Sequence, residues 1–328
     1  MNRMSSQYQL GLSLIELMVS LLIGSVLTLG VANMYVQSKV NYFQDEQTYR
    51  MQEGARYAAR LLSREISMSG YPLGVFDSSI IAVNSVANDC GAAGIDWILN
   101  PSNALEHTDN ITAAISGDYS CISDSSIIET GSGGSDLLVV KRSADGPAYD
   151  DGELNPLATF LNTAHYFRVT NGGNSASIVK GSAVLPVDKI AGSGVDLWQY
   201  YARIFMIRNY AVDVGDGIPT LIVGSLEDDG IGPPEAYVEG IEKLNLEFGI
   251  DSDDDDIVDY FIGTPTAAEI SDSITVRIHL LMRSIDAVTG YVNDKSYAMG
   301  SENVAAKNDG FLRRVYSTTV KIRNLTGR

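Results

Sequence analysis

The chain has 328 residues, 45% of them hydrophobic, so it is long enough to bury one large core or two modest ones. Its formal net charge is −18, which argues against a nucleic-acid partner, because binding a phosphate backbone needs a positive surface. An acidic, self-repelling surface of this kind fits a soluble domain in an extracytoplasmic compartment.

The N-terminal region contains an apolar run, residues 12–36, that is long enough to cross a bilayer as a helix. A secretory signal peptide would have a shorter apolar core of about 7–15 residues, followed by a small-residue cleavage site. No clear site of that kind follows here, so we expect the span to be retained. Arg3 precedes the span and is a weak positive-inside signal, which places the short N-terminus in the cytoplasm and the bulk of the chain in the periplasm.

A single carboxylate, Glu16, interrupts the start of this apolar run. A charge at membrane depth costs about 2.5–3.5 kcal/mol on insertion scales, and less near the interface, where a side chain can snorkel to water. The surrounding residues are Gly11, then Leu12-Ser13-Leu14-Ile15-Glu16, then an unbroken apolar segment. This pattern resembles the class III signal of type IV prepilins.

The resemblance implies that residues 1–11 are a leader, which a prepilin peptidase removes by cutting between Gly11 and Leu12. It also implies that the new amine of Leu12 is methylated, although the family most often has Phe at this position. In the family the glutamate pairs with the N-terminal amine of a neighbouring subunit, so Glu16 would fix the axial register of assembly. A buried polar group that specifies register at a cost in stability has precedent in coiled coils.

Helical periodicity continues through residues 37–70. One stripe repeats every three or four positions and contains Met51, Ala55, Ala58, Leu62, Ile66 and Ser69. We assign the opposite, polar face to Gln52, Glu53, Arg56, Arg60, Arg64 and Glu65. Gly70 and the following Tyr71-Pro72 are a stop signal. Span and amphipathic half together predict one helix of about 60 residues, half in lipid or a filament core and half packed on a domain.

Beyond residue 71 the pattern changes to alternation, which predicts half-buried antiparallel strands separated by turns. The clearest strands are residues 243–250, 273–282 and 313–325, and further candidates are residues 136–142, 165–170, 202–212 and 220–227. We expect residues 71–328 to form one β-rich periplasmic domain, in which residues 77–135 are rich in loops. The predicted fold class is α+β, with the long helix packed on one antiparallel sheet.

Residues 237–325 resemble the PilW-type minor pilins, in which a strand leads to an Asp-rich loop and the last strand ends in a similar Arg-Asn-Leu, here residues 323–325. The resemblance covers residues 11–72 and 237–325, and residues 73–236 carry no motif that we can place. It implies a type IV pilin fold and an inner-membrane protein that later joins the pilus, at its tip. The implied partners are other minor and major pilins, the prepilin peptidase and the inner-membrane assembly machinery.

The two cysteines, Cys90 and Cys121, could be buried thiols, unrelated residues or one disulfide. Export favours the disulfide, because oxidising compartments form and keep such bonds. Closing a loop of about 30 residues stabilises a fold by about 3–4 kcal/mol if the effect is the lost entropy of the unfolded chain. The segment between the cysteines is rich in Ser, Gly, Asn and Asp, so it would gain from such a link.

An acidic loop follows the strand at residues 243–250. Asp251, Asp253, Asp255 and Asp259 are spaced so that a turn could aim several oxygens at one calcium ion, with Asp254 and Asp256 as substitutes. An EF-hand is disfavoured, because the sixth position is Asp256 rather than glycine and strands flank the loop. A solvated acidic turn is the alternative, although the mutual repulsion of the carboxylates favours a cation. No other cofactor is expected.

The chain shows no enzyme motif. His107, His165 and His279 have no metal-ligand spacing, and no nucleophile elbow, Walker or dinucleotide-binding pattern is present. His279 lies opposite the apolar row of its predicted strand, so we expect it at the surface or an edge. A membrane-tethered hydrolase with a hidden Ser-His-Asp triad is a remote alternative.

The sequence therefore predicts a non-enzymatic minor type IV pilin that takes part in initiating pilus assembly, in a complex of minor pilins at the filament tip. Two alternatives would have the same N-terminal signal and apolar helix. One is a minor pseudopilin of a type II secretion system, and the other is an adhesive tip subunit whose middle region binds a surface or ligand.

Overall fold

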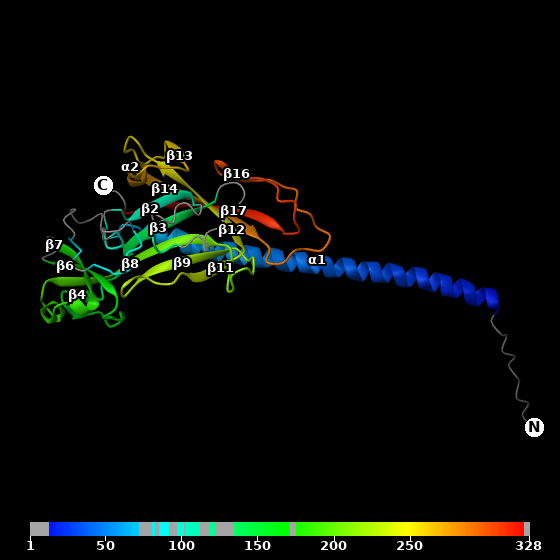
Figure 1. The fold of residues 1–328 in the computed structure, drawn as a ribbon, viewed down its shortest axis with the longest axis horizontal. Coiled ribbons are helices and arrows are strands. Elements are labelled where there is room, and N and C mark those ends of the chain that lie inside the picture. Colours follow the sequence, from blue (N-terminus) through cyan, green and yellow to red (C-terminus); the bar gives the residue numbers. More distant parts are fainter. Residues whose placement is uncertain are drawn as a thin grey trace, which may run out of the picture.

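A computed structural model of the chain describes residues 13–71, 81–82, 85–91, 97–101, 103–111, 119–122, 134–170 and 175–324. One long helix, α1 (Leu14–Met68), projects from a β-rich domain toward the N-terminus (Figure 1). The predicted leader, residues 1–11, and Leu12 lie outside the described residues.

Helix α1 has 55 residues, which makes it about 80 Å long at the α-helical rise. Ser13 is its N-cap, and the helix ends as the stop signal predicts, with Ser69 as the C-cap. Gly70 then adopts a φ of +75°, and a Cβ at this position would meet the carbonyl oxygen of Asn324 at 2.7 Å. Glycine is therefore required both by the left-handed turn and by the close approach of the C-terminal segment.

The predicted α+β class is confirmed, but the strands form two main sheets rather than one. The larger sheet has 11 strands, with the order β1-β7-β6-β8-β3-β2 and with β9, β11, β10, β4 and β5 attached beside that path. Its strands are β1 (Ile81–Ala82), β2 (Leu105–Ile111), β3 (Ser135–Ser143), β4 (Tyr149–Asp150), β5 (Glu153–Leu154), β6 (His165–Thr170), β7 (Ser175–Lys180), β8 (Val195–Arg208), β9 (Thr220–Glu227), β10 (Gly230–Ile231) and β11 (Glu235–Glu239).

The smaller sheet has the order β13-β12-β14-β17, and a separate hairpin pairs β15 with β16. These elements are β12 (Ile241–Ile250), β13 (Tyr260–Ile262), the short helix α2 (Ala267–Ser271), β14 (Ser273–Arg283), β15 (Tyr297–Met299), β16 (Glu302–Val304) and β17 (Arg313–Lys321). Residues 73–236, which carry no recognisable motif, thus supply nearly all of the larger sheet. Alternation predicts that a strand exists, but not which strands become its neighbours.

The C-terminal half of α1 packs between the two sheets. Its predicted apolar stripe is confirmed, because Met51, Ala55, Ala58, Leu62 and Ile66 are all buried. They form one core with residues of both sheets. The larger sheet contributes residues of β3, β8 and β9, and the smaller sheet contributes residues of β12 and β14 and Ile322, which follows β17. The helix is therefore the common support that holds both sheets together.

The polar face of β12 is buried as well as its apolar face. Every residue of β12 is buried, including Lys243 and Asn245. The segment after β14 covers this face: the amide of Asn245 donates to the carbonyl oxygen of Met299 (2.7 Å), and Lys243 pairs with Glu302 (2.5 Å). Alternation correctly predicts which residues share a face, but here the polar face meets protein rather than water.

Candidate functional site: the N-terminal helix and the acidic loop

The first turn of α1 contains both Ser13 and Glu16. The hydroxyl oxygen of Ser13 accepts a hydrogen bond from the backbone N–H of Glu16 at 3.3 Å. The Ser-x-x-Glu spacing is that of a capping box, in which the acidic side chain also lies favourably near the positive end of the helix dipole. Glu16 is exposed. Its charge thus favours the start of the helix through the helix dipole, beside the role in assembly that the resemblance implies.

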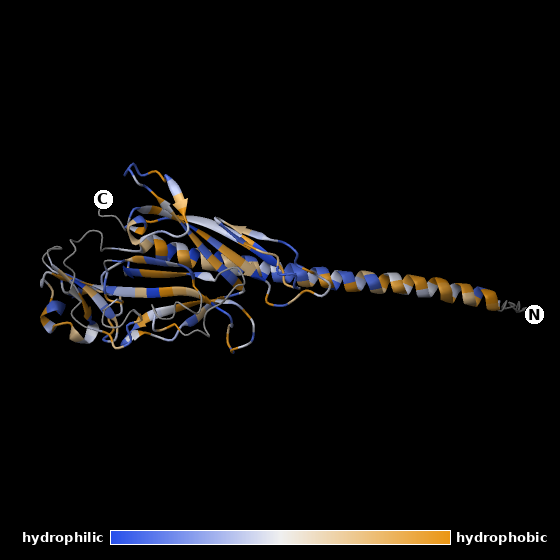
Figure 2. Cartoon of the chain, turned by 45° about the horizontal axis from the view of Figure 1, so that its top comes forward, coloured by the Kyte–Doolittle hydropathy of each residue, from blue (hydrophilic) through white to orange (hydrophobic). Residues whose placement is uncertain are grey.

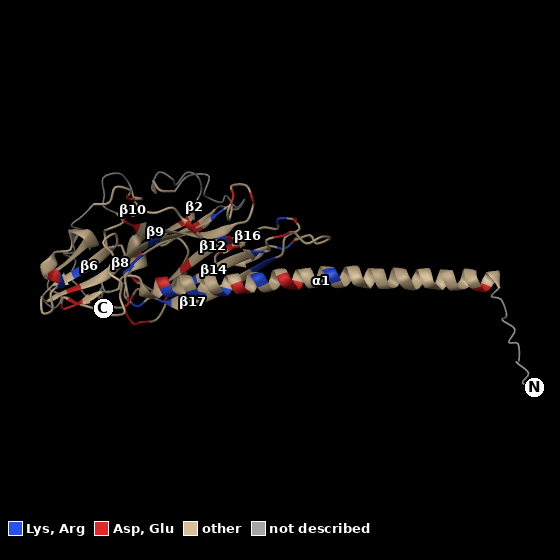
Figure 3. Ribbon diagram, turned by 90° about the horizontal axis from the view of Figure 1, so that it is seen from below, with Lys and Arg blue, Asp and Glu red and all other residues tan. Residues whose placement is uncertain are grey.

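The N-terminal half of α1 is not buried by the described part of the domain. The apolar side chains here are largely exposed; Leu14, Val31 and Met34, for example, are 80%, 66% and 75% exposed. Figure 2 shows this half as almost continuously apolar, whereas Figure 3 shows the charged residues of the helix concentrated on the half next to the domain. Within the described residues, α1 is the one helix long and apolar enough to cross a membrane. An apolar surface of this size needs a covering of lipid or of other helices.

A buried ion-pair cluster joins α1 to the larger sheet. The carboxylate of Glu65 accepts two bonds from Arg142 of β3, each 2.8 Å, and one from Arg203 of β8 at 2.7 Å. The side chains of Glu65 and Arg142 are only 2% and 5% exposed. Assigning Glu65 to the solvated face is therefore wrong. The carboxylate can be buried because two arginines from strands far along the chain neutralise it and satisfy its oxygens.

The predicted disulfide between Cys90 and Cys121 is confirmed, with the two Cα atoms 4.9 Å apart. Cys90 is fully buried, and its carbonyl oxygen accepts a hydrogen bond from the N–H of Ser120 at 2.9 Å. The bond therefore fastens the segment before β2 to the segment before β3, on the face of the larger sheet where Cys90 packs.

The buried side chain of Lys141 is a second anchor in this region. Its ammonium donates to the carbonyl oxygens of Trp97 and Asn100 and pairs with Glu106 at 2.8 Å. Burial lowers the pKa of Lys141, and the nearby Glu106 carboxylate opposes that shift. This lysine holds a loop segment against β2 and β3 where regular backbone pairing is lacking.

The acidic loop brings together three of the four predicted calcium ligands. Oxygens of Asp251, Asp253 and Asp259 all lie within 4.8 Å of one another. Asp251 is buried and accepts the backbone N–H groups of Asp255 (3.2 Å) and Asp256 (3.0 Å), which folds the loop around it. Asp255 is not in this group; its carboxylate instead accepts the N–H of Ile257 at 2.9 Å.

The charges of this loop act on one another. The carboxylate of Asp255, followed by burial and by Asp259 and Asp251, raises the pKa of Asp253. The hydroxyl and N–H of Ser252 lower the pKa of Asp259, because both donate to its ionised form. The negative charges around Asp253 thus oppose its ionisation, and a cation bound there would compensate them.

A second group of potential ligands comes from two different strands and has no signature in sequence spacing. Ligand atoms of His107, Asp109 and Asp136 lie within 4.8 Å of one another, and the Nε2 of His107 is 2.9 Å from the Oδ2 of Asp136. Asp136 also accepts the N–H groups of Leu246 (2.7 Å) and Asn110 (3.1 Å). These bonds join the larger sheet to β12 of the smaller one, so we interpret the group as a structural link.

The expectation that His279 lies at the surface or an edge is wrong. His279 is only 8% exposed, with its Nδ1 2.8 Å from the hydroxyl of Ser317 and its Nε2 3.1 Å from Glu247. It does lie opposite the apolar row, but that face is covered by the segment after β14. Its partners on β12 and β17 make it a cross-strand polar contact.

Comparisons with known proteins agree with the resemblances found at both ends of the chain. A family model described as type IV pilus-assembly protein W matches residues 205–324, and one for the prokaryotic N-terminal methylation motif matches residues 6–32. Among solved structures, the chain is similar to a type IV-like pilin from Thermus thermophilus, with 11% identity, a TM-score of 0.40, and coverage of 84% of this chain and 97% of that chain. No curated protein matches the sequence.

The methylation motif contains the segment from Gly11 to Glu16, and the longer match runs from β8 through the acidic loop to β17. Between them lies a helix whose first half is apolar and exposed and whose second half packs in the core of the domain. Taken together, the N-terminal motif, this helix and the match over the C-terminal region support the interpretation of the chain as a PilW-like minor type IV pilin.

Proposed function

We propose that the chain takes part in initiating type IV pilus assembly, within a complex of minor pilins at the filament tip. The observation that carries this proposal is the exposed apolar half of α1, which is continuous with the helix that organises the domain. In a bilayer, lipid covers this surface. In a growing filament, the corresponding helices of neighbouring pilins can cover it by close side-chain packing.

The chain is proposed to insert with its N-terminus in the cytoplasm and its domain in the periplasm. A prepilin peptidase then cuts between Gly11 and Leu12, and the freed amine of Leu12 is methylated. We expect no catalysis by this chain itself; the chemistry is performed on it. Partners in the inner membrane would be other minor pilins, the major pilin and the assembly machinery.

Deletion of the gene tests this role. We expect surface pili to be lost, counted by electron microscopy and by immunoblotting of sheared filaments, and restored by the wild-type chain. A Gly11→Val chain should not restore them, because a branched side chain at the cleavage site blocks removal of the leader. Mass spectrometry of the Gly11→Val chain should find residues 1–11 still attached.

The same strains separate the alternatives. Normal piliation with lost protein secretion would instead make the chain a pseudopilin, and normal piliation with lost adherence would make it an adhesive subunit. A correctly shortened Gly11→Val chain would contradict the proposed cleavage site.

We further propose that the acidic loop binds calcium through Asp251, Asp253 and Asp259. The support is their mutual approach to within 4.8 Å and the raised pKa of Asp253. Calcium takes six to eight oxygens, so backbone carbonyls and water would complete the coordination. Because a proton competes for Asp253, binding should weaken as the pH is lowered toward its raised pKa.

Isothermal titration calorimetry of the full chain in detergent tests the calcium proposal. We expect a dissociation constant on the order of 10⁻⁴ M, typical of extracellular sites, and loss of the signal in Asp253→Ala. Asp255→Ala is the matched control, because it removes the same charge from the same loop but not from the three-oxygen group. Absence of binding to the unmodified chain, or equal losses in the two variants, would refute this assignment.

A further inference from the structure

Three tyrosines of α1, Tyr35, Tyr42 and Tyr49, form an exposed stripe that begins where the apolar run ends. They are 62%, 70% and 68% exposed. Because they are spaced seven residues apart, and the helix has about 3.6 residues per turn, all three lie on one side of it. That side is about 180° from the centre of the buried stripe, which lies near Ala58. The tyrosines therefore point away from the protein's own domain.

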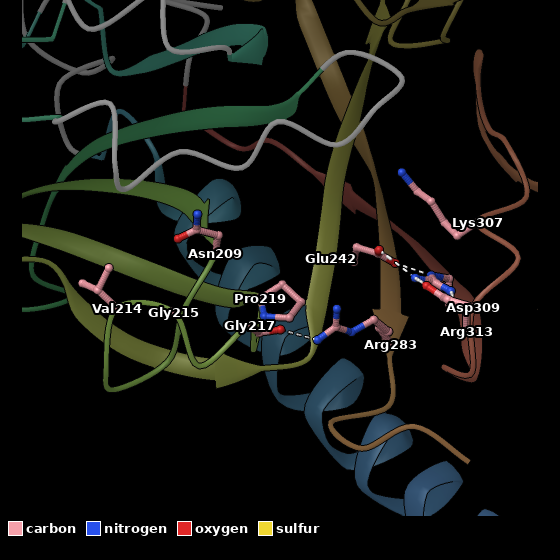
Figure 4. Close-up of a pocket in the computed structure, with 10 residues that line it drawn as sticks. All are labelled: Asn209, Val214, Gly215, Gly217, Pro219, Glu242, Arg283, Lys307, Asp309 and Arg313. Carbon is pink, nitrogen blue, oxygen red and sulfur yellow. Dashed lines mark hydrogen bonds and ion pairs between the residues drawn. The ribbon is translucent and has the colours of Figure 1, made fainter. Parts of the chain in front are cut away.

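The opposite side of α1 is filled by the domain. A Cβ at Gly54 would lie 3.1 Å from the Cε of Met282 and 3.2 Å from the Cγ1 of Val238, so both sheets approach the helix closely here. Figure 4 shows this side of α1 behind β14 and the β8–β9 connection, where a cavity of about 480 Å³ lies beside Arg283. A partner of this part of the helix therefore has to approach from the tyrosine side.

A bilayer explains the exposure of one tyrosine of the three. A hydrocarbon core about 30 Å thick takes about 20 helical residues, so a span that starts at Leu14 ends near Tyr35, and tyrosine is enriched at that interface. Tyr42 and Tyr49 lie about 10 and 21 Å further along the helix, at 1.5 Å per residue. The headgroup region adds only about 5–7 Å to each side of the hydrocarbon core. Tyr42 and Tyr49 therefore lie beyond the lipid.

The seven-residue spacing fits a helix as the covering partner. In a left-handed coiled coil, residues seven apart stay at the contact, because the supercoil removes the drift of about 20° per heptad that a straight helix shows. Ser38 and Asp45, three positions after Tyr35 and Tyr42, are exposed beside the stripe. Tyrosines that alternate with shorter side chains offer knobs and holes to a second helix. Tyrosine is also enriched at protein interfaces, because its ring is large and rigid.

Asp45 argues against a second copy of this chain as that partner. It is exposed and makes no hydrogen bond or ion pair with the described residues. The other flank of the stripe is different, because Glu46 already pairs with Arg50 at 2.7 Å. Lys39, on the same flank, lies 5.7 Å from the centre of the Tyr35 ring. Two parallel copies in register would place Asp45 opposite itself, and like charges across such a contact repel.

We propose that Tyr35, Tyr42 and Tyr49 dock a parallel α-helix of a different subunit, which carries a lysine or arginine opposite Asp45. The helices are parallel because both start in the same membrane. A cation at this level is attracted to Asp45 and distinguishes the partner from a copy of this chain. The inference rests on the proposed function, in that the partner is another pilin.

Photocrosslinking of the full chain in cells tests this docking stripe. Tyr42 is replaced by the photoreactive analogue p-benzoylphenylalanine, and the cross-linked peptides are identified by mass spectrometry. We expect a cross-link to the long N-terminal helix of another pilin. In the chain with this probe, Tyr49→Ala should lower the yield of the cross-link about fivefold, because it removes an aromatic anchor. Asp45→Lys should lower it about tenfold or more, because it sets like charges against each other.

Tyr57→Ala is the matched control. Tyr57 is another tyrosine of α1 and is 53% exposed, but it follows Tyr49 by eight residues instead of seven. The extra residue turns it about 100° away from the stripe. Its loss should leave the yield of the cross-link unchanged, and immunoblotting of membranes verifies that all the chains are present in equal amounts.

The outcome is separable from the assembly role, because helices can cross-link in the inner membrane before a filament forms. A cross-link to a pilin helix, in cells whose pili persist when the gene is deleted, would keep the docking stripe and reject the role in initiation. The docking stripe is overturned if the probe gives no cross-link, or if it labels only lipid, a second copy of this chain or a surface that is not a helix. It is also overturned if Asp45→Lys leaves the yield unchanged, or if Tyr57→Ala lowers it as much as Tyr49→Ala.

Discussion

A Glu16→Gln chain is expected to lose its leader normally but to be nearly absent from filaments. Glutamine has almost the same shape and can still serve at the third position of a capping box, so the first turn of α1 should persist. What is lost is the negative charge that we propose pairs with the N-terminal amine of a neighbouring subunit. Leaving one charge of a buried pair without its partner costs about 3–5 kcal/mol, which corresponds to at least a 100-fold loss of incorporation.

Ser13→Ala is the matched control for Glu16→Gln. It removes the hydroxyl that accepts the N–H of Glu16 but keeps the carboxylate. Loss of an N-cap costs about 1 kcal/mol, so this variant should enter filaments with only a modest deficit. The measurement is the ratio of filament-bound to membrane-bound chain by quantitative immunoblotting, with the mature N-terminus verified by mass spectrometry.

Two outcomes would remove the assembly role from Glu16. One is wild-type filament content for Glu16→Gln. The other is an equal defect in Ser13→Ala, because the effect would then come from capping of the helix rather than from the charge.

A Glu65→Ala chain is expected to have the largest loss of stability of any single change on α1. The substitution leaves Arg142, whose side chain is 5% exposed, without the carboxylate that accepts two of its hydrogen bonds. The free energy of unfolding should fall by about 3–5 kcal/mol, because an unpaired buried charge remains. For a domain of this size that corresponds to a lowering of the melting temperature by roughly 10 °C.

Glu53→Ala is the control, because Glu53 also lies on α1 but its side chain is 77% exposed and 3.6 Å from that of Arg56. Its loss should change stability by no more than about 0.5 kcal/mol. Unfolding would be followed by circular dichroism and urea titration of the full chain in detergent. In a double-mutant cycle, Glu65→Ala and Arg142→Ala should be strongly non-additive. Equal effects of Glu65→Ala and Glu53→Ala would show that the buried cluster does not hold the helix.

The Glu65 cluster also shows where sequence reasoning fails. Glu65 is three positions after Leu62 and one before Ile66, so spacing alone is compatible with the buried stripe. Its charge argues for the solvated face, because a lone buried carboxylate is very costly. The argument fails because Arg142 and Arg203 lie on strands that become neighbours only in the folded sheet.

The prediction for His279 was wrong, whereas the close approach of three carboxylates in the acidic loop could be predicted. The difference is whether the contacts are local in the sequence. The alternation of β14 correctly places His279 opposite the apolar row, but the exposure of that face depends on the distant segment that covers it. In the loop, Asp251, Asp253 and Asp259 are close in sequence, so their approach could be predicted locally. The exclusion of Asp255 depends on a turn hydrogen bond that the spacing does not reveal.

The sequence by itself determined the N-terminal motif, the long helix with its two halves and most of the strands, because each depends on local periodicity or on spacing. It favoured the disulfide without deciding it, because two cysteines allow one pairing but can also remain thiols. Only the tertiary structure decided the division into two sheets, the burial of Glu65, the covered face of β12 and the cavity around Arg283. These depend on contacts between residues far apart in the chain, and a side chain's preference for water or protein does not specify which distant partner will cover it.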